Sequence, residues 1–252
     1  MKLDLQGKVA LVTGGSRGIG AAICRALAAE GVRVGVNYSS SPEQAAEVVA
    51  SIGRAGGEAV ALKGDLEREA EILGLFDALE RRFGPVDVLV NNAAYCPGGP
   101  IGSYTVEEWE KTFRINVTAA FVASKEQVRR LLAAGRRGKI VNIVSQAAFL
   151  GSTSGHLPYD SSKGALVSMT RAVAREVAKA GINVNAVAPG MVRTEMVSAK
   201  LAANLGHYLS RIPLNRVAEP EDVANAVVFL SSAAADYMTG STLDLTGGML
   251  MH

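Results

Sequence analysis

Short apolar runs alternate along this chain with longer stretches that mix apolar and polar residues at helical spacing. The short runs are rich in β-branched residues and contain few polar positions, a pattern typical of strands that are buried on both faces of a parallel sheet. We predict seven strands from this pattern: Val9–Val12, Val32–Val36, Ala59–Leu62, Val86–Val90, Ile140–Val144, Val184–Val187 and Ser241–Leu245.

The stretches between these runs carry signals for helix starts. Ser41 is a typical N-cap residue, and Pro42 after it fits the first turn of a helix. Thr105 and Glu108 have the spacing of a capping box, which predicts that another helix begins there. The alternation of strands and helices predicts an α/β Rossmann fold, a doubly wound parallel sheet of seven strands, in a single domain over residues 1–252.

Two segments break this rhythm. The stretch Met191–Arg216 is long and amphipathic and follows a strand end, where open α/β sheets bind their ligands. Together with the irregular loop Cys96–Ser103 it is expected to shape the substrate pocket. His156 lies three residues before Tyr159, where it is either a substrate contact or an ordinary loop residue.

The composition allows one large apolar core and argues against several classes of function. Of the 252 residues 48% are hydrophobic, while a formal net charge of +2 gives no electrostatic basis for binding nucleic acid or a membrane surface. Cys24 and Cys96 are too few for a disulfide framework, and the three histidines are too scattered to indicate a metal site. With no apolar signal region at its start and no apolar run of membrane-spanning length, the protein is expected to be cytoplasmic.

A glycine-rich segment from Thr13 to Gly20 follows the first predicted strand and opens the first helix. Its glycines would let the backbone approach a pyrophosphate, and a helix N-terminus offers free N–H groups and a favourable dipole to an anion. The spacing Gly-x-x-x-Gly-x-Gly differs from the commoner dinucleotide fingerprint, and a tight turn without a ligand is the alternative. The residues expected to contact a dinucleotide here are Gly14, Ser16, Arg17, Gly18, Ile19 and Gly20.

The end of the second strand indicates which dinucleotide would bind. It reads Asn37-Tyr38-Ser39, where NAD sites tend to place an Asp or Glu against the ribose 2′-hydroxyl. The acid is missing, and Arg17 in the glycine-rich turn can face a 2′-phosphate instead. Both changes favour NADP over NAD. We therefore predict an NADP(H) site with Asn37, Tyr38 and Ser39 among its contacts; the alternative is that Arg17 is a solvated surface cation.

The residues with the clearest chemistry are Tyr159 and Lys163, with Ser145 upstream of them. Four residues make about one helical turn, so the phenol and the ammonium leave the same face of a helix. A nearby cation favours the phenolate, which predicts a lowered pKa for Tyr159 and a usable general base near neutral pH. Combined with a nucleotide-binding turn, this predicts a nicotinamide-dependent oxidoreductase.

The order of motifs along the whole chain resembles that of the short-chain dehydrogenase/reductase family. The matching elements are the glycine-rich turn, Asn91-Asn92-Ala93, Asn116, Ser145, Tyr159-x-x-x-Lys163 and Pro189-Gly190. Within the family, the chain is most similar to 3-oxoacyl-[acyl-carrier-protein] reductases and to sugar or polyol dehydrogenases. It departs from the usual pattern at Ala94, where the family has Gly, and at Thr246, where it has Asp.

The resemblance implies roles for the catalytic residues. Tyr159 would exchange a proton with the substrate oxygen, which Ser145 would hydrogen-bond. Lys163 would lower the pKa of Tyr159 and bind the nicotinamide ribose, and Asn116 would hold a water of a proton relay. Further cofactor contacts are implied at Asp65, Leu66, Asn92, Ala93, Pro189, Gly190, Val192 and Thr194, besides Tyr159 and Lys163.

The resulting expectation is an NADP(H)-dependent enzyme that interconverts a carbonyl and a secondary alcohol, most like a 3-oxoacyl-[acyl-carrier-protein] reductase. The alternatives are a sugar, polyol or small secondary-alcohol dehydrogenase and, more remotely, a non-catalytic NADP sensor. Arg136 and Arg137 fit a carrier-protein contact beside the active-site entrance, whereas Ala180 does not. Apolar residues on more than one face of the predicted helices Val106–Leu132 and Tyr159–Ala180 predict a homotetramer.

Overall fold

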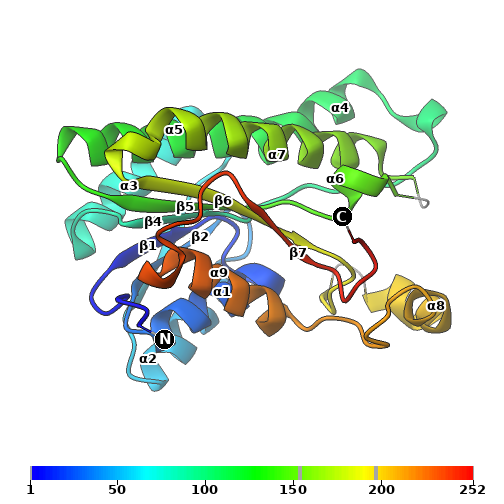
Figure 1. Cartoon of the computed structure of the whole chain (residues 1–252), viewed down its shortest axis with the longest axis horizontal. Coiled ribbons are helices and arrows are strands. Elements are labelled where there is room, and N and C mark those ends of the chain that lie inside the picture. Colours follow the sequence, from blue (N-terminus) through cyan, green and yellow to red (C-terminus); the bar gives the residue numbers. More distant parts are fainter. Residues whose placement is uncertain (1, 153–154, 196–197, 252) are drawn as a thin grey trace.

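All seven strands lie in one sheet, which confirms the predicted α/β fold. The structure, a computed structural model, describes residues 2–152, 155–195 and 198–251. The strand order is β3-β2-β1-β4-β5-β6-β7, and every neighbouring pair is parallel (Figure 1). The strands are β1 (Val9–Val12), β2 (Arg33–Tyr38), β3 (Ala59–Lys63), β4 (Val88–Asn91), β5 (Gly138–Ile143), β6 (Ile182–Pro189) and β7 (Thr242–Leu245).

Helices cover both faces of this sheet. One layer holds α1 (Gly18–Ala29), α2 (Pro42–Arg54) and α9 (Pro220–Ser231), and the opposite layer holds α3 (Glu69–Phe83), α5 (Ala119–Ala133) and α7 (Leu157–Val177) (Figure 1). Each layer buries its own apolar cluster against the sheet, and Cys24 lies fully buried in the first. The shorter helices are α4 (Val106–Phe113), α6 (Ala147–Leu150) and α8 (Ser198–Leu209), with 3₁₀ turns at Ile101–Ser103, Ala178–Ala180 and Ala233–Ala235.

The helix predicted over Val106–Leu132 is interrupted by a π-helical turn. The predicted capping box of Thr105 and Glu108 is present at its start. After α4 the chain forms a π turn over Arg114–Thr118 and then continues as α5. A π turn inserts an extra residue into the helix and so rotates the side chains within it. Asn116, in this turn, is thereby buried.

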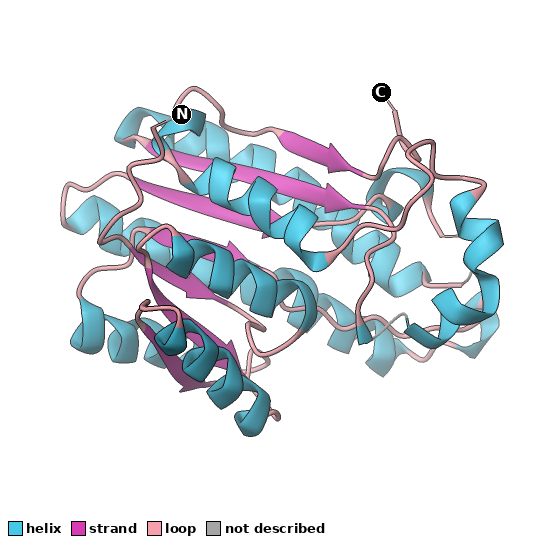
Figure 2. Ribbon diagram, turned by 90° about the horizontal axis from the view of Figure 1, so that it is seen from below, coloured by secondary structure: helices cyan, strands magenta, loops and turns pink. Residues whose placement is uncertain are grey.

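The strand order places the ligand-binding edge. The chain runs outward from β1 to β3 and then returns to continue from β4 to β7, so the order reverses between β1 and β4. In open α/β sheets this reversal leaves a crevice at the carboxyl ends of the strands. The loops there lie beside α8 and the C-terminus (Figure 2). No helix in the described part of the chain is long and apolar enough to cross a membrane.

Candidate active site

The glycine-rich turn between β1 and α1 is shaped to receive an anion. Gly14 and Gly18 have φ of 61° and 51°, which an L side chain adopts only with strain. A Cβ on Gly20 would lie 2.2 Å from the carbonyl oxygen of Gly14, so only glycine fits there. Arg17 is the N-cap of α1 but makes no side-chain cap, and the first turn carries no acidic residue. The N–H groups of this helix end therefore remain available for a phosphate.

Thr13 and Asn92 hold the turn against the end of β4. The Thr13 hydroxyl accepts hydrogen bonds from the backbone N–H groups of Asn92 (3.0 Å) and Ala93 (3.2 Å). The Asn92 amide donates to the carbonyl oxygens of Thr13 (2.9 Å) and Gly14 (3.1 Å). Asn92 is thus committed to bracing the turn. Thr13 was assigned no role of its own from the sequence, although it is the hydroxyl residue that directly follows the first strand.

Asn37 lies behind the glycine-rich turn, with its side chain committed to the protein itself. The residue is 1% exposed. Its amide oxygen accepts a hydrogen bond from the Gly14 N–H (3.1 Å), and its amide nitrogen donates to the carbonyls of Leu62 (3.3 Å) and Gly64 (3.1 Å). The amide nitrogen also lies within hydrogen-bond reach of the Tyr38 carbonyl (3.4 Å), so the hydrogen bonds of the Asn37 side chain go to the protein. The cofactor contact predicted at Asn37 stays a prediction. Arg17 and Ser39 are exposed.

Asp65 and Leu66 begin the loop that leads from β3 into α3. One Asp65 carboxylate oxygen accepts from the Glu67 N–H (3.0 Å), and the other lies 3.7 Å from Nε of Arg68. The half-exposed carboxylate of Asp65 therefore partly stabilises the turn in which Asp65 itself lies. Leu66 lines a small cavity of about 10 Å³ together with Thr13 and Asn116.

Ser145, Tyr159 and Lys163 come together at the carboxyl end of β5. Ser145 follows the strand, its hydroxyl accepts from the Ala147 N–H (3.1 Å), and its side chain hydrogen-bonds the Tyr159 phenol. Lys163 is 1% exposed, one turn after Tyr159 on α7. Its Nζ donates to the carbonyl oxygen of Ile143 (2.7 Å) and lies 5.5 Å from the centre of the Tyr159 ring.

Burial dominates the electrostatics of this group. It raises the pKa of Tyr159, and the hydrogen bond from Ser145 offsets this only in part. Burial also lowers the pKa of Lys163 to about 8. The sequence predicted a lowered pKa for Tyr159, whereas in the structure of the chain the pKa is raised. The ammonium is turned toward the Ile143 carbonyl and lies over the ring, and the partly buried Tyr159 side chain loses part of its solvation.

The side-chain amide of Asn116 hydrogen-bonds the backbone of Tyr95 and the side chain of Ser162. Its oxygen accepts from the Tyr95 N–H (2.7 Å), and its nitrogen donates to the Tyr95 carbonyl (2.9 Å) and to the Ser162 hydroxyl (2.9 Å). Ser162 in turn donates to the Tyr159 carbonyl (2.6 Å). Asn116 therefore fixes the start of the loop after β4 against the helix turn that carries Tyr159 and Lys163. Ser162 was not singled out from the sequence, since a serine inside a helix carries no distinctive signal.

The segment after β6 contacts both the end of β7 and the glycine-rich turn. Gly190 donates its N–H to the Leu245 carbonyl (3.0 Å), and a Cβ on it would lie 3.0 Å from Cα of Thr246. Thr194 stands beside α1, because a Cβ on Gly18 would lie 3.5 Å from its methyl group. Val192 is buried.

Backbone hydrogen bonds to Ala218, which lies just after Arg216, hold the two ends of the segment Met191–Arg216 together. Arg193 N–H donates to the Ala218 carbonyl (2.8 Å), and Ala218 N–H donates to the Met191 carbonyl (3.0 Å). A cavity of about 540 Å³ lies between the end of this segment and the C-terminal turn, and Met191, Leu214 and Leu250 are among its lining residues. Ser145, Tyr159 and Lys163 do not line this cavity, so it is distinct from the catalytic group.

The basic pair Arg136–Arg137 lies at the edge of the sheet opposite to Ser145. Both residues directly precede β5, whose carboxyl end leads to Ser145. Arg136 is also engaged in an ion pair with the buried Asp87 (2.7 Å). This corrects the expected position of the pair beside the entrance, since within one chain the length of β5 separates it from the catalytic residues. Among the described residues, no three His, Cys, Asp or Glu side chains group as a metal site.

Comparison with known proteins finds relatives that match nearly the whole chain. A family model described as enoyl-(acyl carrier protein) reductase matches residues 14–250. The chain is 40% identical over 248 residues to a 3-oxoacyl-[acyl-carrier-protein] reductase of Synechocystis sp., covering 98% of both chains. It is 36% identical over 254 residues to glucose 1-dehydrogenase 2 of Bacillus subtilis, covering 100% of this chain and 98% of the relative.

Solved structures show the same architecture. A blue fluorescent protein from a metagenomic library, in complex with NADPH, superposes with a TM-score of 0.90 at 37% identity, covering 98% of this chain and 100% of the other. A putative 2-deoxy-D-gluconate 3-dehydrogenase from Agrobacterium tumefaciens with bound NADP superposes with a TM-score of 0.89 at 37% identity, covering 97% and 96%.

Proposed function

This chain belongs to the short-chain dehydrogenase/reductase family of oxidoreductases, and from that premise we propose that it is an NADP(H)-dependent carbonyl reductase that can also oxidise secondary alcohols. The observation that carries the proposal is the phenol of Tyr159, hydrogen-bonded by Ser145 and backed by the buried Lys163. These three residues lie at the carboxyl edge of the sheet. The same edge carries the glycine-rich turn that leads into α1, a helix without a side-chain cap.

The chain's residues supply proton chemistry and orientation. A bound nicotinamide would supply the hydride. Because burial raises its pKa, Tyr159 stays protonated at neutral pH and is ready to donate a proton to a carbonyl oxygen that gains negative charge. Ser145 offers that oxygen a second hydrogen bond. Oxidation of an alcohol needs the phenolate instead, so we expect reduction to be favoured near neutral pH and oxidation at higher pH.

The proton relay would begin at the main chain of the π turn. The Asn116 amide is already committed to Tyr95 and Ser162. A π turn perturbs the regular backbone ladder, which offers a carbonyl to a water more readily than a regular turn does. In this proposal Asn116 positions Tyr95 and Ser162, and the relay water is held by backbone atoms between them and Lys163.

Two features support NADP(H) as the cofactor. Arg17 is exposed at the N-cap of α1, and no acidic residue occupies positions 37–40 at and after the end of β2. Arg17 can therefore meet a 2′-phosphate without competition from a carboxylate. Two similar structures hold NADPH or NADP, as their descriptions state.

For the substrate, 3-oxoacyl thioesters and small sugar or polyol carbonyls both remain within the proposal, because relatives of both kinds match over nearly the whole chain. One observation favours the second class. Arg136 is ion-paired with Asp87 at the opposite edge of the sheet, and position 180 is Ala, so the basic pair expected to contact a carrier protein does not lie beside Ser145 of its own chain. We also propose a single domain over residues 1–252.

The test is an absorbance assay on the wild-type protein and on Tyr159→Phe. Both are given NADPH with small ketones, sugar-derived carbonyls and 3-oxoacyl thioesters, and NADP with the matching alcohols. We expect turnover with at least one class, and a loss of at least about 100-fold in Tyr159→Phe with NADPH binding unchanged by calorimetry. Full activity of Tyr159→Phe would contradict the mechanism. Tight NADPH binding without turnover of any compound would favour the sensor.

A further inference from the structure

The loop after β4 is hydrogen-bonded to the turn before α7, the helix that carries Tyr159 and Lys163. Gly99 donates its N–H to the Gly155 carbonyl (2.9 Å), and the Tyr104 hydroxyl donates to the same carbonyl (2.8 Å). Nδ1 of His156 lies 2.8 Å from the Pro97 carbonyl oxygen, a distance that requires Nδ1 to carry the proton. We call these five residues, Pro97, Gly99, Tyr104, Gly155 and His156, the mouth clasp.

The clasp depends on close backbone contact. Gly155 has φ of 70°, and a Cβ on it would lie 2.4 Å from the carbonyl oxygen of Gly99. A Cβ on Gly98 would lie 3.0 Å from Cε1 of His156. The first contact admits only glycine at position 155, and the second shows that the imidazole lies directly against the loop.

The clasp is anchored to the helix turn that carries the catalytic tyrosine. The His156 backbone N–H donates to the Ser152 hydroxyl (3.2 Å), and the Ser152 N–H donates to the Asp160 carboxylate (2.6 Å). Asp160 returns a bond from its own N–H to the His156 carbonyl (2.9 Å). Because Asp160 is the neighbour of Tyr159, the clasp and the catalytic tyrosine belong to one connected network.

The clasp also holds Cys96 near the catalytic group. The Cys96 sulfur lies 3.7 Å from Nδ1 of His156, and both Cys96 and Asp160 contribute to the raised pKa of Tyr159. The position of the loop after β4 thus bears on the electrostatic environment of the phenol as well as on the shape of the pocket beside it.

We propose that His156 is a positioning residue that, through Nδ1–H and Pro97, fixes the wall formed by residues 96–99 beside Tyr159 and so sets which substrates fit over the phenol. The proposal rests on the proposed carbonyl reductase function and deepens it, because it names a determinant of substrate fit. The imidazole acts here through the loop it holds, and the substrate needs no contact with it.

The experiment compares His156→Asn with His156→Leu. Asparagine keeps an N–H donor close to the place of Nδ1, whereas leucine keeps bulk and removes the donor. We expect His156→Leu to lower kcat/KM about 10-fold, chiefly through KM, equivalent to about 1.4 kcal/mol. His156→Asn should recover most of this loss. Calorimetric NADPH affinity should stay within about two-fold in both, since the clasp lies away from the glycine-rich turn.

Hydrogen exchange gives a measurement that does not depend on activity. The Gly99 amide, bonded across the clasp, should exchange faster in His156→Leu and at nearly the wild-type rate in His156→Asn. If His156→Leu does not fold, Tyr104→Phe removes a different bond of the clasp and should show the same KM effect. Wild-type KM and Gly99 exchange in the folded leucine or phenylalanine variant would overturn the proposal. A wild-type protein without reductase activity would count against the proposed function, while the exchange data would still decide the clasp.

Discussion

At the residue scale, the predicted preference for NADPH over NADH depends on Arg17. It is exposed and makes no cap to α1, so its guanidinium is available to a 2′-phosphate. We expect Arg17→Ala to weaken NADPH binding by about 10- to 100-fold, the scale of charge-assisted hydrogen bonds, and to leave NADH binding unchanged. Calorimetry with each cofactor measures this. Arg25→Ala, an exposed arginine on the same helix, is the matched control and should change neither affinity. Unchanged NADPH affinity in Arg17→Ala would identify Arg17 as a solvated surface cation.

Asn37 gives a second prediction at this scale, one of stability. An aspartate there would turn a buried carboxylate toward the Leu62 and Gly64 carbonyls that the amide now serves as a donor. We expect Asn37→Asp to lower the free energy of unfolding by about 3 kcal/mol, measured in urea, because the Gly14 N–H would be the only donor left to a buried charge that also faces two carbonyl oxygens. Ser39→Asp, which places the same carboxylate on exposed chain, should stay within about 0.5 kcal/mol of wild type. Equal stability of the two variants would contradict the role assigned to Asn37.

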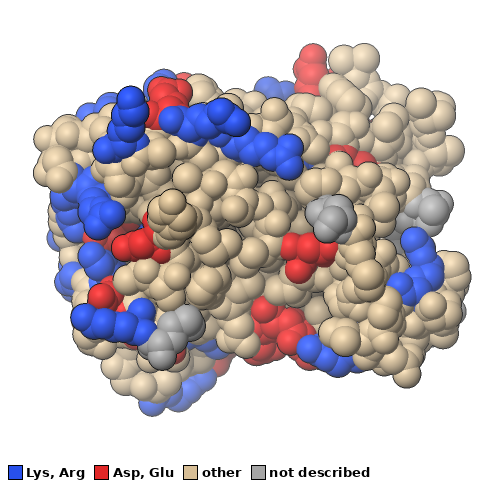
Figure 3. All heavy atoms as spheres, in the orientation of Figure 1, with Lys and Arg blue, Asp and Glu red and all other residues tan. Residues whose placement is uncertain are grey.

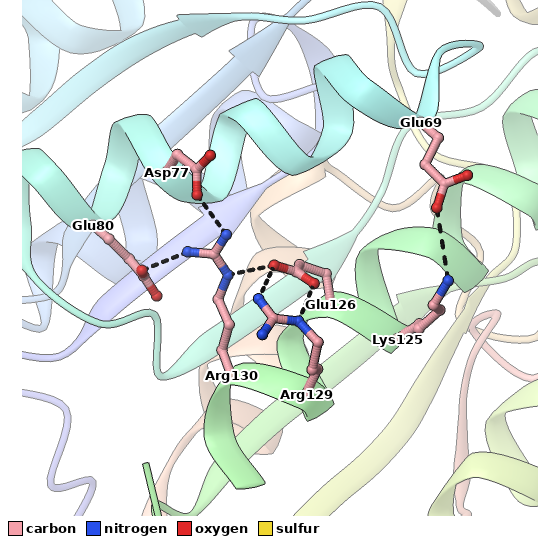
Figure 4. A network of polar contacts seen from close by, with 7 residues as sticks. All are labelled: Glu69, Asp77, Glu80, Lys125, Glu126, Arg129 and Arg130. Atoms are coloured by element: carbon pink, nitrogen blue, oxygen red, sulfur yellow. Dashed lines mark hydrogen bonds and ion pairs between the residues drawn. The ribbon is translucent and has the colours of Figure 1, made fainter. Parts of the chain in front are cut away.

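At the element scale, one arginine joins α5 to α3 on the face of the sheet that carries the catalytic helix. Arg130 of α5 donates to Asp77 and Glu80 of α3 and to Glu126 of its own helix (Figure 4). Its side chain is 18% exposed. We expect Arg130→Met to cost about 2 kcal/mol in urea unfolding, because it removes the cation that Asp77 and Glu80 share.

The neighbouring arginine provides the control. Arg129 bonds only Glu126 among the contacts drawn in Figure 4, and its side chain is 61% exposed, so Arg129→Met should cost less than about 1 kcal/mol. If the two variants lost equal stability, the connection between α3 and α5 would not be the source of the effect.

The same network predicts a pH dependence. Hydrogen bonds from Arg129 and Arg130 lower the pKa of Glu126 from 4.5 to about 2. A lowered carboxyl pKa stabilises the folded chain fully above pH 4.5, and that contribution is lost as the pH falls toward 2. The wild-type free energy of unfolding should therefore decline over this window, and the decline should be shallower in Glu126→Gln. Parallel pH profiles of the two proteins would contradict this assignment.

At the scale of the whole molecule, exposed apolar side chains predict assembly. Phe121 and Leu132 of α5 are 49% and 53% exposed, and Leu214 and Met251 are exposed beside the larger cavity. Most of the lysine and arginine of the face shown in Figure 3 lies along its left and upper edges, while much of the centre carries no charge. Two such apolar surfaces can each pair about a two-fold axis, which generates a homotetramer.

Light scattering coupled to gel filtration should give a mass near four chains of 26.2 kDa. Phe121→Asp should reduce it to a dimer, because a charge would then lie in one of the two apolar surfaces, whereas Tyr237→Asp, at a fully exposed position away from α5, should leave it unchanged. A monomeric wild-type protein at micromolar concentration would contradict the assembly.

The sequence by itself determined the strands, their parallel arrangement and the identity of the family. These follow from periodicity and motif order, which are local properties: the strand predicted at Val9–Val12 matches β1, and the other six differ from their observed bounds by a few residues. The proximity of Tyr159 and Lys163 was predictable for the same reason, since helical geometry alone brings them together.

Only the tertiary structure decided what the polar side chains do. Asn37 finds its partners 23 to 27 residues away, Asn92 braces a turn 78 or more residues earlier, and Asn116 meets Ser162 46 residues later. The pKa of Tyr159 depends on the burial that such distant segments create. Desolvation and hydrogen bonding are properties of packed surroundings, so no spacing within the sequence could have fixed them.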